Sequence, residues 1–270
     1  MKIPLNVKTF NVLVTFNRPT PVRMLATTTF RGLLGHVLAE QSPELIAKIF
    51  KPGFNSDTPA PYSLAPENNQ HSPANHLNFK LITFDPDGTA IETFDQIIHF
   101  CEGKHFGTSG SIIKSCEMSP GRWFENVIYN PIPQKISINF NSPVSFKYNG
   151  KKVTGENFTL PLLIYAIYNT ITRLCKYYSI NGQKPSLPKW PDVLGNSYVQ
   201  KNNLEWISPK RYSSSQETTL NLSGLVGNII IPNPTEQLLQ ILNFAALTGI
   251  GKNTVHGCGR ITWNRIQSNK

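Results

Sequence analysis

Residues 249–260 read GIGKNTVHGCGR and carry two Gly-x-Gly pairs separated by five residues. The hydrophobic pattern predicts a helix before this glycine-rich loop, over 235–247, and a strand after it, over 260–266. That order excludes two common glycine-rich sites, because a dinucleotide-binding loop and a P-loop each follow a strand and open a helix. Two alternatives remain, namely a tight structural turn and a loop whose backbone approaches a phosphate chain.

The charges around the glycine loop favour the second alternative. Glycine permits positive φ and close approach of the backbone, and Lys252 and Arg260 place a cation near either end of the loop. Exposed amide groups beside cations suit phosphate oxygens. We therefore expect the ligand to contact Gly249, Gly251, Lys252, His256, Gly257, Gly259 and Arg260.

The overall charge agrees with a polyanionic partner. The chain has 270 residues, with 26 Lys and Arg against 16 Asp and Glu, which gives a formal net charge of +10. Cations that neutralise phosphates release counterions, so a basic protein suits a nucleic acid. An ordinary basic protein with no such partner is the alternative. Hydrophobic residues make up 39% of the chain, which is enough for a buried core.

The cysteines and the apolar runs set further limits. The four cysteines, Cys101, Cys116, Cys175 and Cys258, form no C-x-x-C pair, so the sequence indicates neither a zinc ribbon nor a redox dithiol. No apolar run approaches the ~20 residues that span a bilayer, and the N-terminus lacks the pattern of an export signal. We expect reduced thiols, a cytoplasmic location and no membrane contact.

The N-terminal half alternates strands and helices. Strands are expected over 5–16, 77–84, 111–117 and 123–129, and helices over 28–40 and 92–100. A further short helix is expected after Ser42 as N-cap, with Pro43 at its first position. Residues 18–21 should end the first strand, and 54–75, rich in Pro, Asn and Ser, should form a long loop.

The pattern of strands and helices starts again after the expected domain boundary, Asn130-Pro131-Ile132-Pro133. Strands are expected over 135–140, 144–148, 203–212, 220–231 and 260–266, helices over 159–178 and 235–247, and a loop over 184–191. Thr235 should cap the last helix. The fold class is therefore α+β, with two ferredoxin-like, RRM-like domains in tandem, residues 1–131 and 132–270.

Three segments carry a family resemblance. The first is the glycine loop, whose spacing and helix-loop-strand order match the glycine loop of the RAMP superfamily of CRISPR-associated RNA-binding proteins. The others are residues 211–216, RYSSSQ, which lead into LSGLVG at 222–227, and FRGLLGH at 30–36. These two resemble elements of the endoribonucleases that process CRISPR repeats. All three occur in that family's order and rough spacing, and together they cover nearly the whole chain.

The resemblance implies a concrete activity. Such enzymes have two ferredoxin-like domains, bind the repeat of a precursor CRISPR RNA and cut it once per repeat, with no metal and no cofactor. A ribose 2′-hydroxyl attacks the adjacent phosphate and leaves a 2′,3′-cyclic phosphate and a 5′-hydroxyl. The implied partner is the CRISPR repeat RNA. A CRISPR effector complex and a homodimer stay open as further assemblies.

His36 is the first choice for the chemistry, which needs a base, an acid and cations. Projected on a helix, residues 30–40 place Phe30, Leu33, Leu34, Val37 and Leu38 on one apolar arc. His36 falls on the opposite side, beside Gly32 and Ala39. The resemblance also places a catalytic histidine on the first helix of the N-terminal domain. The alternative is a surface histidine that pairs with Glu40 at i+4.

His256 is the second choice among the six histidines. It lies inside the glycine loop, where the family usually has an aromatic or apolar residue, so it is also a candidate for stacking on a base or contacting phosphate. His71 and His76 lie in the expected long loop, and no carboxylate or cysteine completes a metal site with them. His99 and His105 flank Cys101 across a Glu-Gly break, so no metal is expected there either.

A second candidate cluster lies at the end of the strand expected over 203–212. Lys210 and Tyr212 join His36 as catalytic candidates, because a cation neutralises the phosphate and a hydroxyl hydrogen-bonds the ribose or a phosphate oxygen. Arg211, Ser213 and Arg31 are expected to contact RNA. The alternative for this cluster is a basic surface strand.

Two other classes of protein compete with the endoribonuclease. A RAMP subunit without catalytic activity would bind guide RNA inside an effector complex. A generic RNA-binding module with two RRM-like domains is less favoured, because the chain lacks the aromatic run that marks an RRM sheet.

Overall fold

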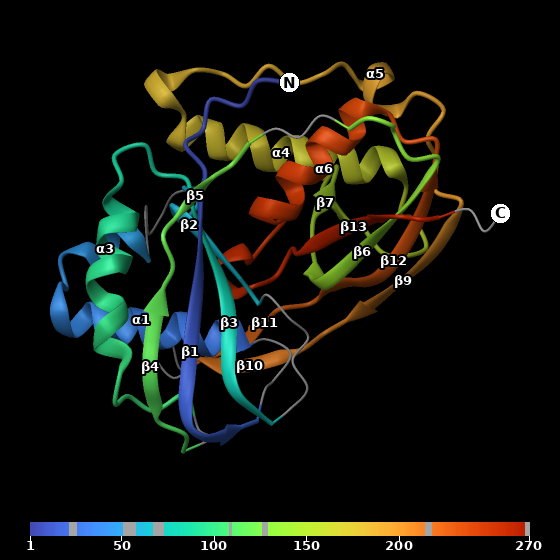
Figure 1. The fold of residues 1–270 in the computed structure, drawn as a ribbon. Helices are drawn as coiled ribbons and strands as arrows, with labels where there is room; N and C mark the ends of the chain where they lie inside the picture. The colour runs from blue at the N-terminus through green and yellow to red at the C-terminus, as the bar shows by residue number, and fades with distance from the viewer. Residues whose placement is uncertain are drawn as a thin grey trace.

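Two antiparallel sheets, each built from one half of the chain, form the framework of the protein (Figure 1). The computed structural model describes residues 1–21, 26–50, 58–66, 73–107, 110–125, 129–213 and 218–267, and for 210–213 and 218–220 it describes the backbone alone. The following bounds and contacts refer to these residues.

The N-terminal sheet has the strand order β2-β3-β1-β4, and β5 pairs with the start of β1. Its strands are β1 (Lys8–Thr20), β2 (Tyr62–Pro66), β3 (Ala74–Thr83), β4 (Ile113–Met118) and β5 (Arg122–Trp123). Helices α1 (Ala26–Gln41) and α3 (Thr89–Ile98) pack on one face, with α2 (Leu45–Ile49) and the 3₁₀ turn η1 (His99–Cys101) beside them. Alternate side chains of β1 enter this core, namely Phe10, Val12, Val14 and Phe16.

The C-terminal sheet has the order β13-β6-β12-β9. Its strands are β6 (Lys135–Val144), β9 (Lys201–Ile207), β12 (Gly224–Pro232) and β13 (Ile261–Arg265), and its helices are α4 (Leu160–Tyr178) and α6 (Glu236–Thr248). Smaller elements are the hairpins β7 (Lys147–Tyr148) with β8 (Lys151–Lys152) and β10 (Lys210–Ser213) with β11 (Thr218–Asn221), the helix α5 (Trp190–Leu194), and the turns η2 (Ile180–Gly182) and η3 (Thr254–His256).

The two halves share one topology. Each runs strand, helix, strand, strand, helix, strand, and in each sheet the first and third main strands lie in the centre. This is the ferredoxin-like arrangement, so the predicted α+β fold with two such domains is confirmed. Thr159 and Thr235 cap α4 and α6 by accepting hydrogen bonds from Leu162 N and Leu238 N, and the predicted cap at Thr235 is therefore also confirmed.

The chain start ties the two halves together. Lys2 and Leu5 form bridges with Ser186 and Ser179, and Val7 belongs to the C-terminal core. The sheets themselves divide between Trp123, where β5 ends the first set of strands, and Lys135, where β6 begins the second. The exact domain limits of 1–131 and 132–270 stay a prediction, and the first seven residues pack mainly with the second half.

Several predicted elements differ from the structure. β1 continues to Thr20 because an irregular register between Thr15 and Thr20 accommodates Pro19. The segment expected to be a long loop contains β2, whose pairing with β3 outweighs its proline content. Ser42 makes no cap, since α2 begins at Leu45 after Glu44. β6 runs through 141–143 where a break was expected, with a register shift opposite, and the strand expected over 123–129 is described only as far as Trp123.

Candidate functional site

The glycine loop joins the cores of the two halves. Ile250 is fully buried in the C-terminal core, whereas Val255 of η3 packs against the N-terminal core. Thr27, in the first turn of α1, donates a hydrogen bond from Oγ1 to the carbonyl of His256 at 2.8 Å. The loop therefore fixes the start of α1 against the C-terminal half.

The glycines of this loop are required by contacts inside the protein. Gly251 has φ of 79°, and a Cβ there would lie 2.4 Å from the carbonyl oxygen of Ser145. Gly257 has φ of 84°, and a Cβ there would lie 2.0 Å from Thr27 Oγ1. Both positions need a residue with no side chain, for backbone conformation as well as space. Gly249, Gly257 and Gly259 are buried, which leaves residues 251–256 as the accessible part of the loop.

Arg260 differs from its predicted role as an RNA contact. Arg260 is only 7% exposed. Its Nη1 donates hydrogen bonds to the carbonyls of Leu247 at 2.5 Å and Ala246 at 3.4 Å. These carbonyls end α6 and lack helical partners, so the guanidinium caps the helix. Burial lowers the pKa of Arg260 to about 9, and the group stays cationic at neutral pH. Lys252, by contrast, is exposed.

Arg260→Ala is expected to lower the free energy of unfolding by about 2 to 3 kcal/mol, because two carbonyls at the end of α6 lose their donor. Lys252→Ala is the matched control and should change stability by less than about 0.5 kcal/mol, since its side chain is at the surface. Urea denaturation followed by circular dichroism measures both. Equal stability of the two variants would show that Arg260 does not cap α6.

His36 lies at the surface of α1 as predicted. The buried side of α1 contains all five residues of the predicted apolar arc, while Gly32, His36 and Ala39 are exposed. The His36 side chain is 66% exposed, and its Nε2 lies 3.0 Å from Glu40 Oε1. The pairing with Glu40 that was the alternative to catalysis is thus present.

Glu40 links His36 to a third residue. Lys104, between η1 and β4, places Nζ 2.7 Å from Glu40 Oε2. The hydrogen bond from Lys104, and then the positive charges of Lys104 and His36, lower the pKa of Glu40. A charged carboxylate that accepts from Nε2 orients the imidazole and leaves Nδ1 as the ring nitrogen able to take a proton. We name His36, Glu40 and Lys104 the histidine triad.

Arg31 lies apart from this triad. Its Nη2 donates to the carbonyl of Phe50 at 3.3 Å, and its guanidinium stacks 5.1 Å from the centre of the Phe50 ring. Arg31 and His36 are five positions apart, which places them about 140° apart around α1. The structure therefore places Arg31 in the packing of the N-terminal half, away from the predicted RNA contact.

The hairpin β10–β11 contains the other catalytic candidates. Lys210, Arg211, Tyr212 and Ser213 form β10, which pairs with β11 from Lys210 opposite Asn221 to Ser213 opposite Thr218. Their side chains, and residues 214–216 of the RYSSSQ segment, lie outside the described part of the structure. The roles predicted for Lys210 and Tyr212, and the RNA contacts of Arg211 and Ser213, stay predictions.

The remaining five histidines differ in exposure. His76, His99 and His105 are exposed, His256 is partly buried, and His71 lies outside the described residues. Within those residues, no three His, Cys, Asp or Glu side chains gather as metal ligands would. All four cysteines are buried and free. Across the same residues, no helix combines the length and apolar character of a membrane span.

A polar surface on the C-terminal sheet was not anticipated from the sequence. On β6 and β13, Ser137 donates to Asn139 and Thr262 donates to Asn141. On the neighbouring strands, Asn203 donates to Asn228 at 2.9 Å. The alternation of Ser and Asn with buried Ile136, Ile138 and Phe140 was the available signal.

Tandem ferredoxin-like domains with a glycine loop between their cores are the arrangement that the sequence resemblance implied. Residues 138–261 match the family model "CRISPR-associated endoribonuclease Cas6". This match covers somewhat less than half of the chain, and it agrees with the resemblance seen in the sequence.

Solved structures agree with this fold. A Cas6 product complex is similar with a TM-score of 0.56 and 17% identity, over 97% of this chain and 100% of that one. Thermus thermophilus Cas6 is similar with a TM-score of 0.57 and 14% identity, over 96% and 99%. A RAMP protein binding different RNA substrates is similar with a TM-score of 0.55 and 8% identity, over 96% of this chain and 100% of that one. A search of curated protein sequences gave no significant match.

Proposed function

We propose that the protein is a metal-independent endoribonuclease that binds the repeats of precursor CRISPR RNA and cuts them into guide units. The match of residues 138–261 to the Cas6 family model supports an endoribonuclease activity on CRISPR RNA. The observation that carries the finer proposal is the histidine triad, in which a surface imidazole on α1 is oriented through Nε2 by a carboxylate. An accessible, oriented imidazole is suited to proton transfer near neutral pH.

The proposed reaction needs only groups of the protein and the RNA. Nδ1 of His36 takes the proton of a ribose 2′-hydroxyl, and the resulting oxygen attacks the adjacent phosphorus. The bond from phosphorus to the 5′-oxygen breaks, which leaves a 2′,3′-cyclic phosphate, and the 5′-oxygen receives a proton and becomes a hydroxyl. We assign charge stabilisation to Lys210 and protonation or orientation of a reacting oxygen to Tyr212.

RNA binding is proposed for the accessible part of the glycine loop and for β10. Lys252 supplies an exposed cation, and His256 lies beside it in the same loop. Arg211 and Ser213 extend this surface on the hairpin. Arg31 and Arg260 are left out, because their guanidinium groups bond backbone carbonyls of the protein. We expect the protein to act in the cytoplasm, where precursor CRISPR RNA is made.

A labelled CRISPR repeat RNA incubated with the protein in EDTA is expected to be cut once per repeat. A 2′-deoxy substitution at the cut site should abolish the cut, because it removes the nucleophile. Denaturing gels and mass spectrometry identify the position and the cyclic phosphate. Cleavage of the deoxy RNA, or products that end in a 3′-hydroxyl, would contradict the proposed chemistry.

The second candidate function is a RAMP subunit that binds guide RNA without cutting it. It is supported by the similarity to the RAMP protein binding different RNA substrates and to a Cas6-RT-Cas1–Cas2 complex, with TM-scores of 0.55 and 0.60. Tight binding of the repeat with no product in the EDTA assay would favour this function over the enzyme.

A further inference from the structure

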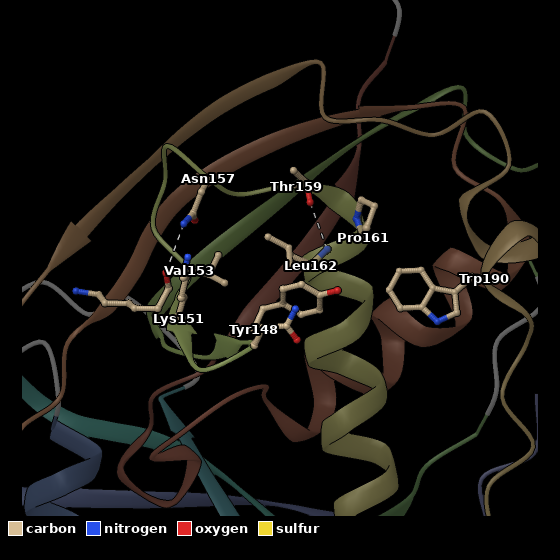
Figure 2. A pocket seen from close by; sticks show the side chains of 10 residues that line it. Tyr148, Lys151, Val153, Asn157, Thr159, Pro161, Leu162 and Trp190 are labelled. Atoms are coloured by element: carbon tan, nitrogen blue, oxygen red, sulfur yellow. Dashed lines mark hydrogen bonds between the residues drawn. The ribbon is translucent and has the colours of Figure 1, made fainter.

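A pocket of about 560 Å³ lies in the C-terminal half, on elements that take no part in the histidine triad (Figure 2). The hairpin β7–β8, the first turn of α4 and the start of α5 surround it. In this view Leu162 lies just above the ring of Tyr148, and Pro161 lies above and between the rings of Tyr148 and Trp190 (Figure 2). None of the ten residues that line the pocket is acidic, and two are lysines.

The two aromatic rings are exposed and held in place. Tyr148 is 43% exposed, and its ring meets that of Tyr165 at 5.0 Å with an interplanar angle of 89°. Trp190 is 37% exposed, and its ring meets that of Tyr168 at 6.0 Å and 66°. A near-perpendicular contact covers at most one face of a ring. Tyr165 and Tyr168 follow one another at i and i+3 on α4, so one rigid helix positions both rings.

The pocket is also strongly basic. Exposed lysines occur at four positions around it, Lys147, Lys151, Lys152 and Lys189. None of them forms an ion pair with another of the residues that the structure describes. Lys152 lies over the ring of Trp206, at 3.2 Å from its centre. Glu156 and Asp192 are the acidic residues in the two segments that contribute these lysines, 147–162 and 189–192.

We propose that this pocket binds an unpaired nucleotide of the RNA substrate, with the base stacked against Tyr148 and Trp190 and the phosphates near Lys151 and Lys152. Aromatic faces over an apolar floor suit a nucleobase, and lysines in a lining that contains no acidic residue suit the phosphate chain. This inference deepens the proposed function, because it adds a binding site remote from His36 for single-stranded RNA. Stacking accepts any base, so little sequence preference is expected.

The test uses the full chain and a short, unstructured, fluorescein-labelled polyuridine RNA, followed by fluorescence anisotropy. Tyr148→Ala and Trp190→Ala should each raise the Kd by about 10-fold, because each removes a stacking surface. Tyr198→Ala is the matched control, since Tyr198 is 54% exposed but does not line the pocket. An unchanged Kd in both pocket variants would overturn the proposal.

Charge reversal gives a second measurement that does not depend on the aromatic rings. Lys151→Glu should weaken polyuridine binding and reduce its salt dependence, whereas Lys176→Glu at the other end of α4 should have a smaller effect. With repeat RNA, the pocket variants should raise KM and leave kcat unchanged. A lower kcat with unchanged binding, or UMP that binds as tightly as polyuridine, would contradict a site for single-stranded RNA. Because polyuridine needs no cleavage, this result is independent of the proposed enzymatic activity.

Discussion

His36→Ala is expected to lower the single-turnover rate of repeat-RNA cleavage by about 10²- to 10⁴-fold, the usual contribution of a positioned acid or base. The Kd for repeat RNA should change little, because the imidazole is one exposed group on a helix whose fold depends on its other face. The rate is measured with enzyme in excess over labelled RNA, and binding with a 2′-deoxy repeat. His99→Ala is the matched control, since His99 is an exposed histidine in the same half of the chain.

The partner of His36 sharpens this prediction. Glu40→Gln keeps the shape of the side chain but removes the charge that orients Nε2, so cleavage should slow by about 10-fold while binding is retained. Because the pKa of Glu40 is lowered, its carboxylate stays charged at pH values where an ordinary glutamate is already partly protonated. Loss of activity at mildly acidic pH should therefore not arise from Glu40. Wild-type rates in both His36→Ala and Glu40→Gln would show that the triad is not the active site.

The sequence predicted the fold and part of this site for physical reasons. Helical periodicity separated His36 from the apolar arc of α1, and the i+4 spacing placed Glu40 beside it. Lys104 was not predicted, because it lies 64 residues further along the chain and meets Glu40 only through the packing of η1 and β4. A contact between residues so far apart along the chain produces no periodic pattern that a single sequence would show.

For the glycine loop, the sequence correctly predicted the backbone conformation, but the reason for the glycines is packing inside the protein. Gly-x-Gly spacing correctly indicated positive φ and close backbone approach. The close partner at Gly257 is Thr27 of the protein itself, and Arg260 turns inward to the end of α6. A glycine or an arginine in this local pattern can serve either packing or ligand binding. Which role it has depends on the residues that the fold places around it.

Gly257→Ala is expected to lower the free energy of unfolding by about 2 to 5 kcal/mol. Positive φ costs an alanine about 1 to 2 kcal/mol, and forcing a methyl group into a packed contact costs about 1 to 3 kcal/mol more. The new Cβ would lie 2.0 Å from Thr27 Oγ1 and 2.8 Å from Thr27 Cβ, so the start of α1 has to move. Urea denaturation measures the loss.

Gly150→Ala separates the two costs. Gly150 has φ of 76°, and no atom lies within 4 Å of the position that an added Cβ would take. Gly150→Ala should therefore lower the free energy of unfolding only by the cost of positive φ, about 1 to 2 kcal/mol. Thr27→Ala in the Gly257→Ala background should recover about 1 kcal/mol, since it removes the nearest atom. An equal loss of unfolding free energy in Gly150→Ala and Gly257→Ala would show that the contact between Gly257 and α1 adds no cost.

Because Thr27 and His36 lie on the same helix, about 14 Å apart along its axis, a shifted α1 should also slow cleavage in Gly257→Ala but not in Gly150→Ala.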